Sequence, residues 1–277
     1  MKRLLAEAPA DERELECARR PMHRDIRALR QEVSELRRAI DALKRASADR
    51  ITAVLPYYGY GRQDRKDKPR VPISAKLVAS LLETAGAHRI MALDLHAAQI
   101  QGFFDIPVDN IYSGPILLGD VWKQNYKNLV VVSPDVGGVV RARALAKRLE
   151  SDLAIIDKRR PQANVAEVVN VVGEVEGKDC IIPDDMIDTA GTVSEAARAL
   201  KGLGARDIYV CATHALLSGP AVERLSKAPI KEVAVTNSIA IPESRRFPAL
   251  TVLSVGELFA KAIRFTHADQ SVSSLFE

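Results

Sequence analysis

The sequence predicts an α/β fold with two domains, each built on a parallel sheet flanked by helices. From about residue 50 onward, short runs rich in valine and isoleucine alternate with stretches of helical pattern. The apolar runs are hydrophobic on both faces, which is typical of parallel strands covered by helices on each side. The alternation occurs twice, over about 50–112 and 113–260, and therefore indicates two domains.

Each expected strand is a short apolar run with β-branched residues, and the expected helices lie between such runs. We expect strands at 51–58, 89–95, 128–135, 153–158, 180–185, 208–215 and 231–238. We expect helices at 73–86, 139–150, 192–204 and 219–227. Gly86 and Gly204 stand where a glycine commonly ends a helix. In such a fold, polar site residues gather at the carboxyl ends of the strands.

The segment before residue 46 differs, because it is rich in arginine and glutamate. Its apolar residues recur at three- and four-residue steps, at Leu29, Val33, Leu36, Ile40 and Leu43. This spacing predicts an amphipathic helix over Arg27 to Arg45, with Pro21 as a break upstream. We expect this helix to cover the first sheet. A coiled-coil partner is the alternative, although sustained heptads need about three or four repeats.

Composition excludes several classes of function. The 277 residues are 47% hydrophobic and 27% charged, as in a globular protein. Only 5% are aromatic and the net charge of +4 is spread along the chain, so we expect no nucleic-acid binding. No apolar stretch approaches the roughly 20 residues that span a bilayer, and no signal peptide is evident. Cys17, Cys180 and Cys211 have no metal-binding spacing, so we expect a cytoplasmic protein with the last two buried in strands.

The stretch DDMIDTAGT, residues 184–192, follows an apolar run and leads into a helical pattern. A glycine loop that opens a helix offers N–H groups and a favourable dipole to a phosphate. We therefore expect a phosphomonoester to be bound by Asp188, Thr189, Ala190, Gly191 and Thr192. Asp184 and Asp185 stand far enough back to accept hydrogen bonds from the hydroxyls of a sugar diol. A cluster of helix-capping residues is the alternative interpretation.

Polar residues also follow three earlier strands. Arg62, Gln63 and Asp64 follow the first of these strands. The guanidinium fork of Arg62 and the amide of Gln63 suit a nucleotide. The alternative is that this charged stretch is an ordinary solvated surface. His96 follows the second and could bind a divalent metal through one ring nitrogen, unless it is structural. Asp135 follows the third and is a candidate for Mg²⁺ or its waters, with a helix-capping loop as the alternative.

Three consecutive cations, Lys158, Arg159 and Arg160, follow another strand in a loop-like stretch. Cations in such a loop could neutralise the charge of a polyphosphate in a transition state. The alternative is that they remain solvated. The sequence pattern leaves both interpretations open.

Together these five stretches resemble the ribose-phosphate diphosphokinases of class I, which have the type I phosphoribosyltransferase fold and make 5-phosphoribosyl 1-diphosphate (PRPP). The resemblance runs from about Ala39 to the C-terminal SVSSLF. Its most specific motifs are DLHAAQIQGFFDIPVDN, SPDVGGVVRARALAKRL, IIDKRRPQANV and DDMIDTAGT. It implies an atypical helical segment at 1–38 and phosphoribosyltransferase-like domains at 39–112 and 113–277. It also implies transfer of the diphosphoryl group of MgATP to O1 of ribose 5-phosphate by a homo-oligomer, usually a hexamer built from dimers.

The resemblance implies roles for individual residues. ATP would be bound by Arg62, Gln63 and Asp64, and the Mg²⁺ of the nucleotide would be bound by His96 and Asp135. The transferred group would be stabilised by Lys158 and Arg160. Ribose 5-phosphate would be bound by Asp184, Asp185, Asp188, Thr189, Ala190, Gly191 and Thr192. An allosteric site for phosphate and ADP would include Ser271, Ser273 and Phe276, with inorganic phosphate as an activator.

The sequence before about Ala39 does not reproduce the family's opening strands. It also does not reproduce the family's loop that packs on adenine in a neighbouring subunit's site. We therefore expect a truncated first domain and weaker ATP binding. Pro183 stands where a β-branched residue is usual, and we expect it at the end of a strand.

The sequence is consistent with three functions: PRPP synthesis, a catalytically impaired regulatory subunit that joins intact relatives, and a phosphoribosyltransferase that consumes PRPP. The last would not need the RQDRK and KRR stretches.

Overall fold

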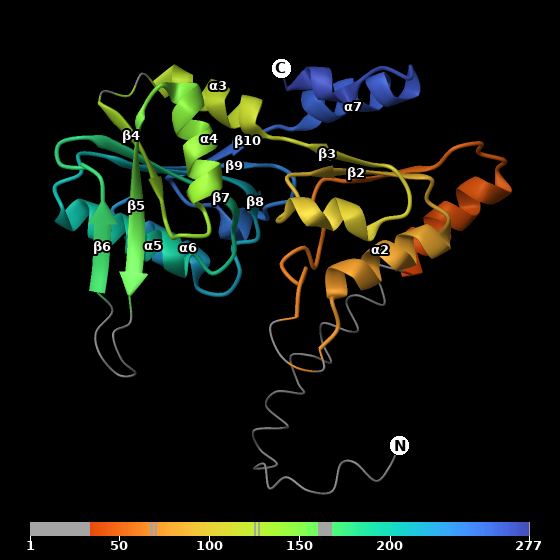
Figure 1. Ribbon diagram of the computed structural model, residues 1–277, viewed down its shortest axis with the longest axis horizontal. Helices are drawn as coiled ribbons and strands as arrows, with labels where there is room; N and C mark the ends of the chain where they lie inside the picture. Colours follow the sequence, from red (N-terminus) through yellow and green to blue (C-terminus); the bar gives the residue numbers. More distant parts are fainter. Residues whose placement is uncertain are drawn as a thin grey trace, which may run out of the picture. The chain divides into compact units, whose positions relative to one another are not determined.

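The computed structural model describes residues 34–66, 69, 71–124, 126, 128–159 and 168–276 (Figure 1). These residues form two compact units that interleave along the chain. Unit 1 holds the described residues up to Val54, together with Tyr60–Ile90 and Ala97–Val108. Unit 2 holds Leu55–Gly59, Met91–His96 and the described residues from Asp109 onward. The domain boundaries expected from the sequence stay predictions.

The predicted N-terminal helix is present in unit 1 as far as the structure describes it, at 34–45. Ile40 is buried and Leu36 is half-buried, but Leu43 is 48% exposed. The expectation that Leu43 helps to cover the first sheet is therefore wrong, because the buried stripe is narrower than the apolar pattern. Leu29, Val33 and the break at Pro21 lie outside the described residues.

A three-stranded sheet has the order β1-β2-β3, and its strands contribute residues to both units. Its strands are β1 (Thr52–Leu55), β2 (Arg89–Leu93) and β3 (Val108–Ile111). In unit 1, α2 (Ser74–Ala85) lies beside the 3₁₀ helix η1 (Ala98–Phe103), where Lys76 Nζ donates to the carbonyl of Phe103 at 2.6 Å. Gly86 ends α2 with φ of +107°, as predicted, because a left-handed turn lets its N–H donate to the last carbonyls of the helix.

Unit 2 contains a seven-stranded sheet of order β10-β9-β8-β7-β4-β5-β6. All neighbouring strands are parallel except β5 and β6, which are antiparallel. Its strands are β4 (Leu129–Ser133), β5 (Asp152–Arg159), β6 (Val168–Val172), β7 (Asp179–Ile187), β8 (Ile208–Ala215), β9 (Glu232–Thr236) and β10 (Leu250–Leu253). The predicted parallel sheet is confirmed, with one antiparallel strand added at its edge.

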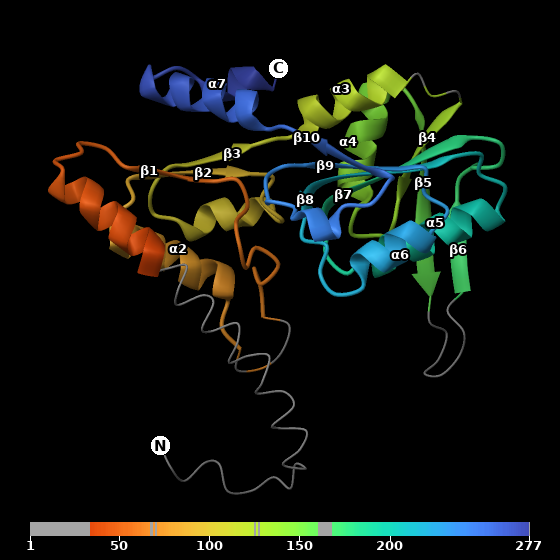
Figure 2. The ribbon, with the colours of Figure 1, turned by 180° about the vertical axis from the view of Figure 1, so that it is seen from behind.

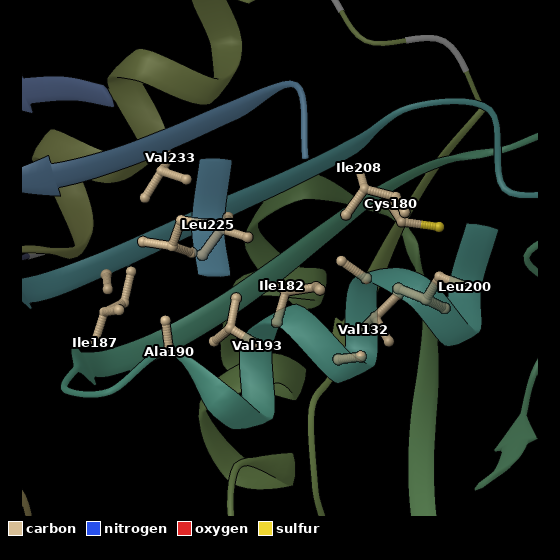
Figure 3. Packing of buried hydrophobic residues seen from close by; sticks show 14 of the residues in the cluster. Val132, Cys180, Ile182, Ile187, Ala190, Val193, Leu200, Ile208, Leu225 and Val233 are labelled. Atoms are coloured by element: carbon tan, nitrogen blue, oxygen red, sulfur yellow. The ribbon is translucent and has the colours of Figure 1, made fainter. Parts of the chain in front are cut away.

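Helices cover both faces of this sheet (Figures 1 and 2). Alternate residues of β7 face opposite ways. Ile181 packs with residues of α3 (Gly114–Gln124), whereas Cys180 and Ile182 pack with residues of α5 (Gly191–Gly202), as Figure 3 shows for the α5 side. The remaining helical segments are α4 (Val139–Leu149), α6 (Ala221–Lys227), η2 (Glu243–Arg245), α7 (Gly256–His267) and η3 (Val272–Leu275).

Two strands of unit 2 are longer than the sequence predicts. β7 continues through Ile187, so Asp184 lies inside the strand and pairs with Ala212 of β8. Pro183 also lies inside it, opposite Cys211, and the expectation of a strand-end proline is wrong. The proline is accommodated because pairing of β7 with β4 ends at Ile181, and beyond that point β7 pairs with β8 alone among the described strands.

The cation stretch also departs from its prediction. The backbone of Lys158 and Arg159 pairs with that of Val169 and Val168 of β6, so β5 extends one residue beyond the strand predicted at 153–158, and Arg159 lies in a strand and not in a loop. The strand extends further because β6 supplies an antiparallel partner, which was not among the predicted strands. Arg160 lies outside the described residues.

Cys180 and Cys211 are buried free thiols, as predicted. Burial raises the pKa of each to about 12, so almost no thiolate forms at neutral pH. We expect a Cys17→Ser variant to show no rapid labelling by a thiol reagent at pH 8 and labelling of both remaining cysteines in denaturant. Rapid labelling of the native variant would contradict the burial of these residues.

Candidate functional site

Four charged or titratable side chains of unit 2 meet beside β7. Asp184 and Asp185 are adjacent in this strand, and Arg141 reaches them from α4. Its Nη1 lies 3.2 Å from Asp184 Oδ1, and its Nη2 lies 3.2 Å from Asp185 Oδ1. His96 approaches from the turn after β2, with Nδ1 2.5 Å from Asp185 Oδ2. One guanidinium and one imidazole therefore hold a pair of neighbouring carboxylates.

The two carboxylates differ in acidity. Burial raises the pKa of Asp184 to about 7, and the neighbouring Asp185 adds to this rise while Arg141 opposes it. Burial also acts to raise the pKa of Asp185, but the hydrogen bond with His96 and the charge of Arg141 outweigh burial, so the pKa of Asp185 is lowered. Near neutral pH, the pair therefore contains one firmly ionised carboxylate and one that changes charge readily.

The loop after β7 leads into the N-terminus of α5, as the sequence predicts. Ala190 has φ of +58° and stands at the N-cap position, and α5 begins at Gly191. The backbone N–H of Ser218 donates to the carbonyl of Asp188 at 2.9 Å, and Arg224 Nη1 donates to the carbonyl of Thr189 at 3.0 Å. A fixed loop at the start of a helix presents N–H groups to an anion. The arrangement suits a phosphate next to the aspartate pair.

A pocket of about 320 Å³ lies beside the pair, within unit 2. Both aspartates line it, together with Asp94, Tyr112, Arg141 and Arg148. Its volume falls in the range of small-molecule sites, which is about 300–1,000 Å³. Apolar side chains also line the pocket, among them Leu117, Leu118 and Leu145, so its polar groups make up only part of the lining.

The metal candidates, His96 and Asp135, are held in different ways. A proton on Nδ1 of His96, donated to Asp185, leaves the lone pair on Nε2, which is the arrangement of a histidine metal ligand oriented by a carboxylate. Asp135 Oδ1 accepts from the N–H of Gly138 at 2.8 Å, so this carboxylate also fixes the loop before α4. Within the described ranges, no three or more His, Cys, Asp or Glu side chains are grouped to hold a metal. Mg²⁺ typically binds only one or two protein carboxylates, and its other ligands are substrate phosphates and waters. His96 and Asp135 therefore fit a metal ion that is bound together with a nucleotide.

The nucleotide candidates Arg62, Gln63 and Asp64 belong to unit 1. The N–H of Gln63 donates to the carbonyl of Tyr60 at 2.9 Å, which closes a turn after β1. Gln99 Nε2 donates to Asp64 Oδ2 at 2.6 Å and links this turn to η1. The three candidates therefore lie on one fixed turn of unit 1, whereas the aspartate pair is in unit 2.

The other site candidates, at Lys158, Arg160 and the C-terminus, belong to other segments of the chain. The side chain of Lys158 and all of Arg160 lie outside the described part of the structure. At the C-terminus, the ring of Phe276 meets the ring of Tyr112 edge-on, with centroids 5.5 Å apart. Ser271 precedes η3, and Ser273 lies within it.

Two arginines of the site were not predicted from the sequence. Arg141 and Arg224 are separated from the residues they contact by 43 and 35 positions, respectively. Each lies on a predicted helix whose pattern places arginines on the polar face, which is their usual position. Only the contact with β7 or with the loop after it distinguishes them from solvated residues.

Comparison with known proteins identifies the family. The model for the N-terminal domain of ribose phosphate pyrophosphokinase matches residues 23–86, and the model for the phosphoribosyl synthetase-associated domain matches residues 158–277. The ribose-phosphate pyrophosphokinase of Bordetella pertussis is 59% identical over 239 residues, which cover 86% of this chain and 77% of that relative. The chain belongs to the ribose-phosphate pyrophosphokinase family. The relative from Bacillus subtilis is also 59% identical, over 245 residues that cover 88% of this chain and 77% of the relative.

Solved structures agree with this family. The crystal structure of phosphoribosylpyrophosphate synthetase from Mycobacterium smegmatis matches with a TM-score of 0.82 and 48% identity, covering 87% of this chain and 80% of that chain. The resemblance and the fold class predicted from the sequence are confirmed. The N-terminal family model begins to match at residue 23, so the likeness extends upstream of Ala39. Among the described residues, no helix combines the length and apolar character needed to cross a bilayer.

Proposed function

We propose that this member of the ribose-phosphate pyrophosphokinase family transfers the diphosphoryl group of ATP to O1 of ribose 5-phosphate, giving PRPP and AMP. The observation that carries the proposal is the aspartate pair bound by Arg141 and His96, directly before the loop that opens α5. Adjacent carboxylates suit a vicinal diol, and the start of a helix suits a phosphate. Ribose 5-phosphate carries both groups.

We assign ribose 5-phosphate to Asp184, Asp185 and the loop Asp188–Thr192. The carboxylates accept hydrogen bonds from the sugar hydroxyls, and the loop N–H groups and hydroxyls donate to the phosphate. This orientation leaves O1 available to attack the β-phosphorus of ATP. The new O1–phosphorus bond forms as the bond from the β-phosphorus to the α,β-bridging oxygen breaks, AMP leaves, and the proton of the sugar hydroxyl is released.

Other residues have supporting roles in this proposal. Arg62, Gln63 and Asp64 bind ATP, and His96 and Asp135 would hold the metal of the nucleotide. Mg²⁺, when bound, neutralises charge on the polyphosphate. Lys158 and Arg160 stabilise the group in transfer, and positioning with charge neutralisation supplies most of the catalysis in such reactions.

The remaining proposals follow from the family resemblance. We infer a cytoplasmic homo-oligomer, a hexamer built from dimers, that is activated by inorganic phosphate. The allosteric site would include Ser271, Ser273 and Phe276. The contact between the rings of Phe276 and Tyr112 is compatible with a fixed C-terminal segment.

The test is a coupled assay of AMP release from MgATP and ribose 5-phosphate, with PRPP identified among the products. We expect AMP and PRPP in equal amounts from the wild-type chain. A Lys158→Ala variant purified in the same way controls for contaminating enzyme, because it should release almost no AMP. Absence of AMP release by the wild-type chain would contradict the proposal and favour the regulatory subunit, whose test is binding to an intact relative.

A further inference from the structure

The turn that carries His96 begins at a residue with unusual backbone geometry. Asp94 directly follows β2 and has φ of +41°, in the left-handed region that residues with side chains rarely adopt. Aspartate tolerates this region better than most residues, but the conformation still has a cost. It persists only where surrounding contacts fix it from several sides, and such positions gather at functional sites. Since Asp94 is two residues before His96, its geometry sets the direction in which the chain presents that imidazole.

The carboxylate of Asp94 is fixed by two other elements of unit 2. Its Oδ2 accepts from the backbone N–H of Ser113 at 3.1 Å, from Ser113 Oγ at 2.5 Å and from Thr213 Oγ1 at 2.7 Å. Ser113 directly precedes α3, and Thr213 lies in β8. Both residues are buried, so water competes little for these hydrogen bonds. Three donors on one carboxylate oxygen make a strong anchor.

The backbone of Asp94 is fixed as well. Its N–H donates to the carbonyl of Ile111 at 2.8 Å. His214 Nε2 lies 3.1 Å from the carbonyl of Leu93 and 3.3 Å from that of Asp94. Carbonyl oxygens only accept, so Nε2 carries the proton and donates. Burial lowers the pKa of His214, and its Nδ1 lies 2.9 Å from Ser238 Oγ, which itself donates to the carbonyl of Thr213 at 3.1 Å.

We propose that Asp94 is a positioning residue, which acts with Ser113, Thr213 and His214 to hold the turn 94–96 so that His96 Nδ1 meets Asp185. The inference rests on the proposed function only for its effect on turnover. Asp94 is a strained residue that is held through its side chain, its N–H and its carbonyl. A strand can end without such a set of contacts, whereas a side chain that must point in one direction needs the turn before it to be fixed.

Two variants separate positioning from stability. Asp94→Asn keeps a residue that tolerates positive φ but removes the charge, and Asp94→Gly keeps the backbone freedom but removes the anchor. Asp179→Asn is the matched control, because Asp179 is a buried aspartate of β7 that is bound by Arg206, at the opposite end of the strand from Asp185. All three variants should lose thermal stability.

The first readout is the NMR signal of the His96 ring nitrogens in the ligand-free chain, assigned with His96→Ala. We expect the Nδ1 signal to move toward that of a free imidazole in both Asp94 variants and to stay in place in Asp179→Asn. The second readout is kcat, which should fall about tenfold or more in the Asp94 variants, as for other residues that orient functional histidines. Adding Asp94→Asn to His96→Ala should cause no further loss, since the effect passes through His96.

Two outcomes would overturn the proposal. One is an unchanged His96 signal in both Asp94 variants. The other is a loss of kcat from Asp94→Asn that persists in full in the His96→Ala background. If the wild-type chain makes no PRPP, the proposed function fails, while the ring-nitrogen comparison still decides whether Asp94 positions His96.

Discussion

Replacing Asp184 with asparagine is expected to make the chain more stable above pH 7, while its affinity for ribose 5-phosphate falls about tenfold or more. The two effects have opposite signs because the same carboxylate is costly to bury and useful to the substrate. Asparagine keeps the shape of the side chain and removes the charge. It also removes one acceptor for a sugar hydroxyl.

The stability effect depends on pH. Burial raises the pKa of Asp184 to about 7, whereas in the unfolded chain the same carboxyl has its ordinary pKa of 3.8. Between about pH 4 and pH 7, the folded chain keeps a proton that the unfolded chain has released, so the free energy of unfolding decreases as pH rises. The full decrease is on the order of 2–4 kcal/mol. An amide in place of this carboxyl cannot titrate, so the variant Asp184→Asn does not undergo this decrease.

The measurement is urea unfolding of both proteins from pH 4 to pH 8.5, with calorimetry of ribose 5-phosphate binding at pH 8. The stability difference should grow from pH 4 to pH 7 and then stay constant. Asp179→Asn is the contrasting control, because Asp179 faces Arg206 with two hydrogen bonds and should only lose stability when changed. A stability difference that does not vary with pH, or unchanged sugar-phosphate affinity, would contradict the assigned environment of Asp184.

All seven predicted strands, which have dense β-branched patterns, are present. β6 (VVNVV) and β10 (LTVL) show the same kind of pattern but were not predicted. Two other missed elements have weaker local signals. β3 contains an aspartate and an asparagine, which are poor strand formers, and α3 begins with Gly-Pro and contains a second glycine. α3 is held by packing of Leu117 and Val121 with Ile181 and Tyr209, which are distant in the sequence. α7 is different, since Leu258, Phe259 and Ala262 form a regular buried stripe that the sequence does display.

The candidate site could be proposed from the sequence where its residues are contiguous. DDMIDTAGT contains the aspartate pair and the helix start in nine residues, which favours a site for a phosphorylated sugar over a helix cap, and this interpretation stays a prediction. The residues that orient the pair come from elsewhere. Arg141 and Asp184 are 43 positions apart, and Asp94 and Thr213 are 119 positions apart. A single sequence has no local signal for such contacts, because each partner alone resembles an ordinary polar residue.

Replacing Lys158 with alanine is expected to lower kcat by about two to three orders of magnitude, with the binding of ribose 5-phosphate nearly unchanged. A cation that acts on the diphosphoryl group matters most as charge develops in the transition state, so its loss reduces turnover more than ground-state affinity. The fold should tolerate the change, because the backbone of Lys158 pairs with that of Val169 in β6 and alanine can make the same hydrogen bonds.

The measurement combines kcat for PRPP formation with calorimetry of ribose 5-phosphate binding and with single-turnover rates, which report the transfer step itself. Lys178→Ala is the matched control. Its ammonium binds Asp152 Oδ2 at 2.8 Å at the first residue of β5, and such exposed ion pairs contribute little to stability because water screens them. The control should therefore keep normal turnover. Near-normal single-turnover rates in Lys158→Ala would remove this lysine from the transfer step and leave the stretch Lys158–Arg160 as solvated surface, which is the interpretation that the sequence alone also allows.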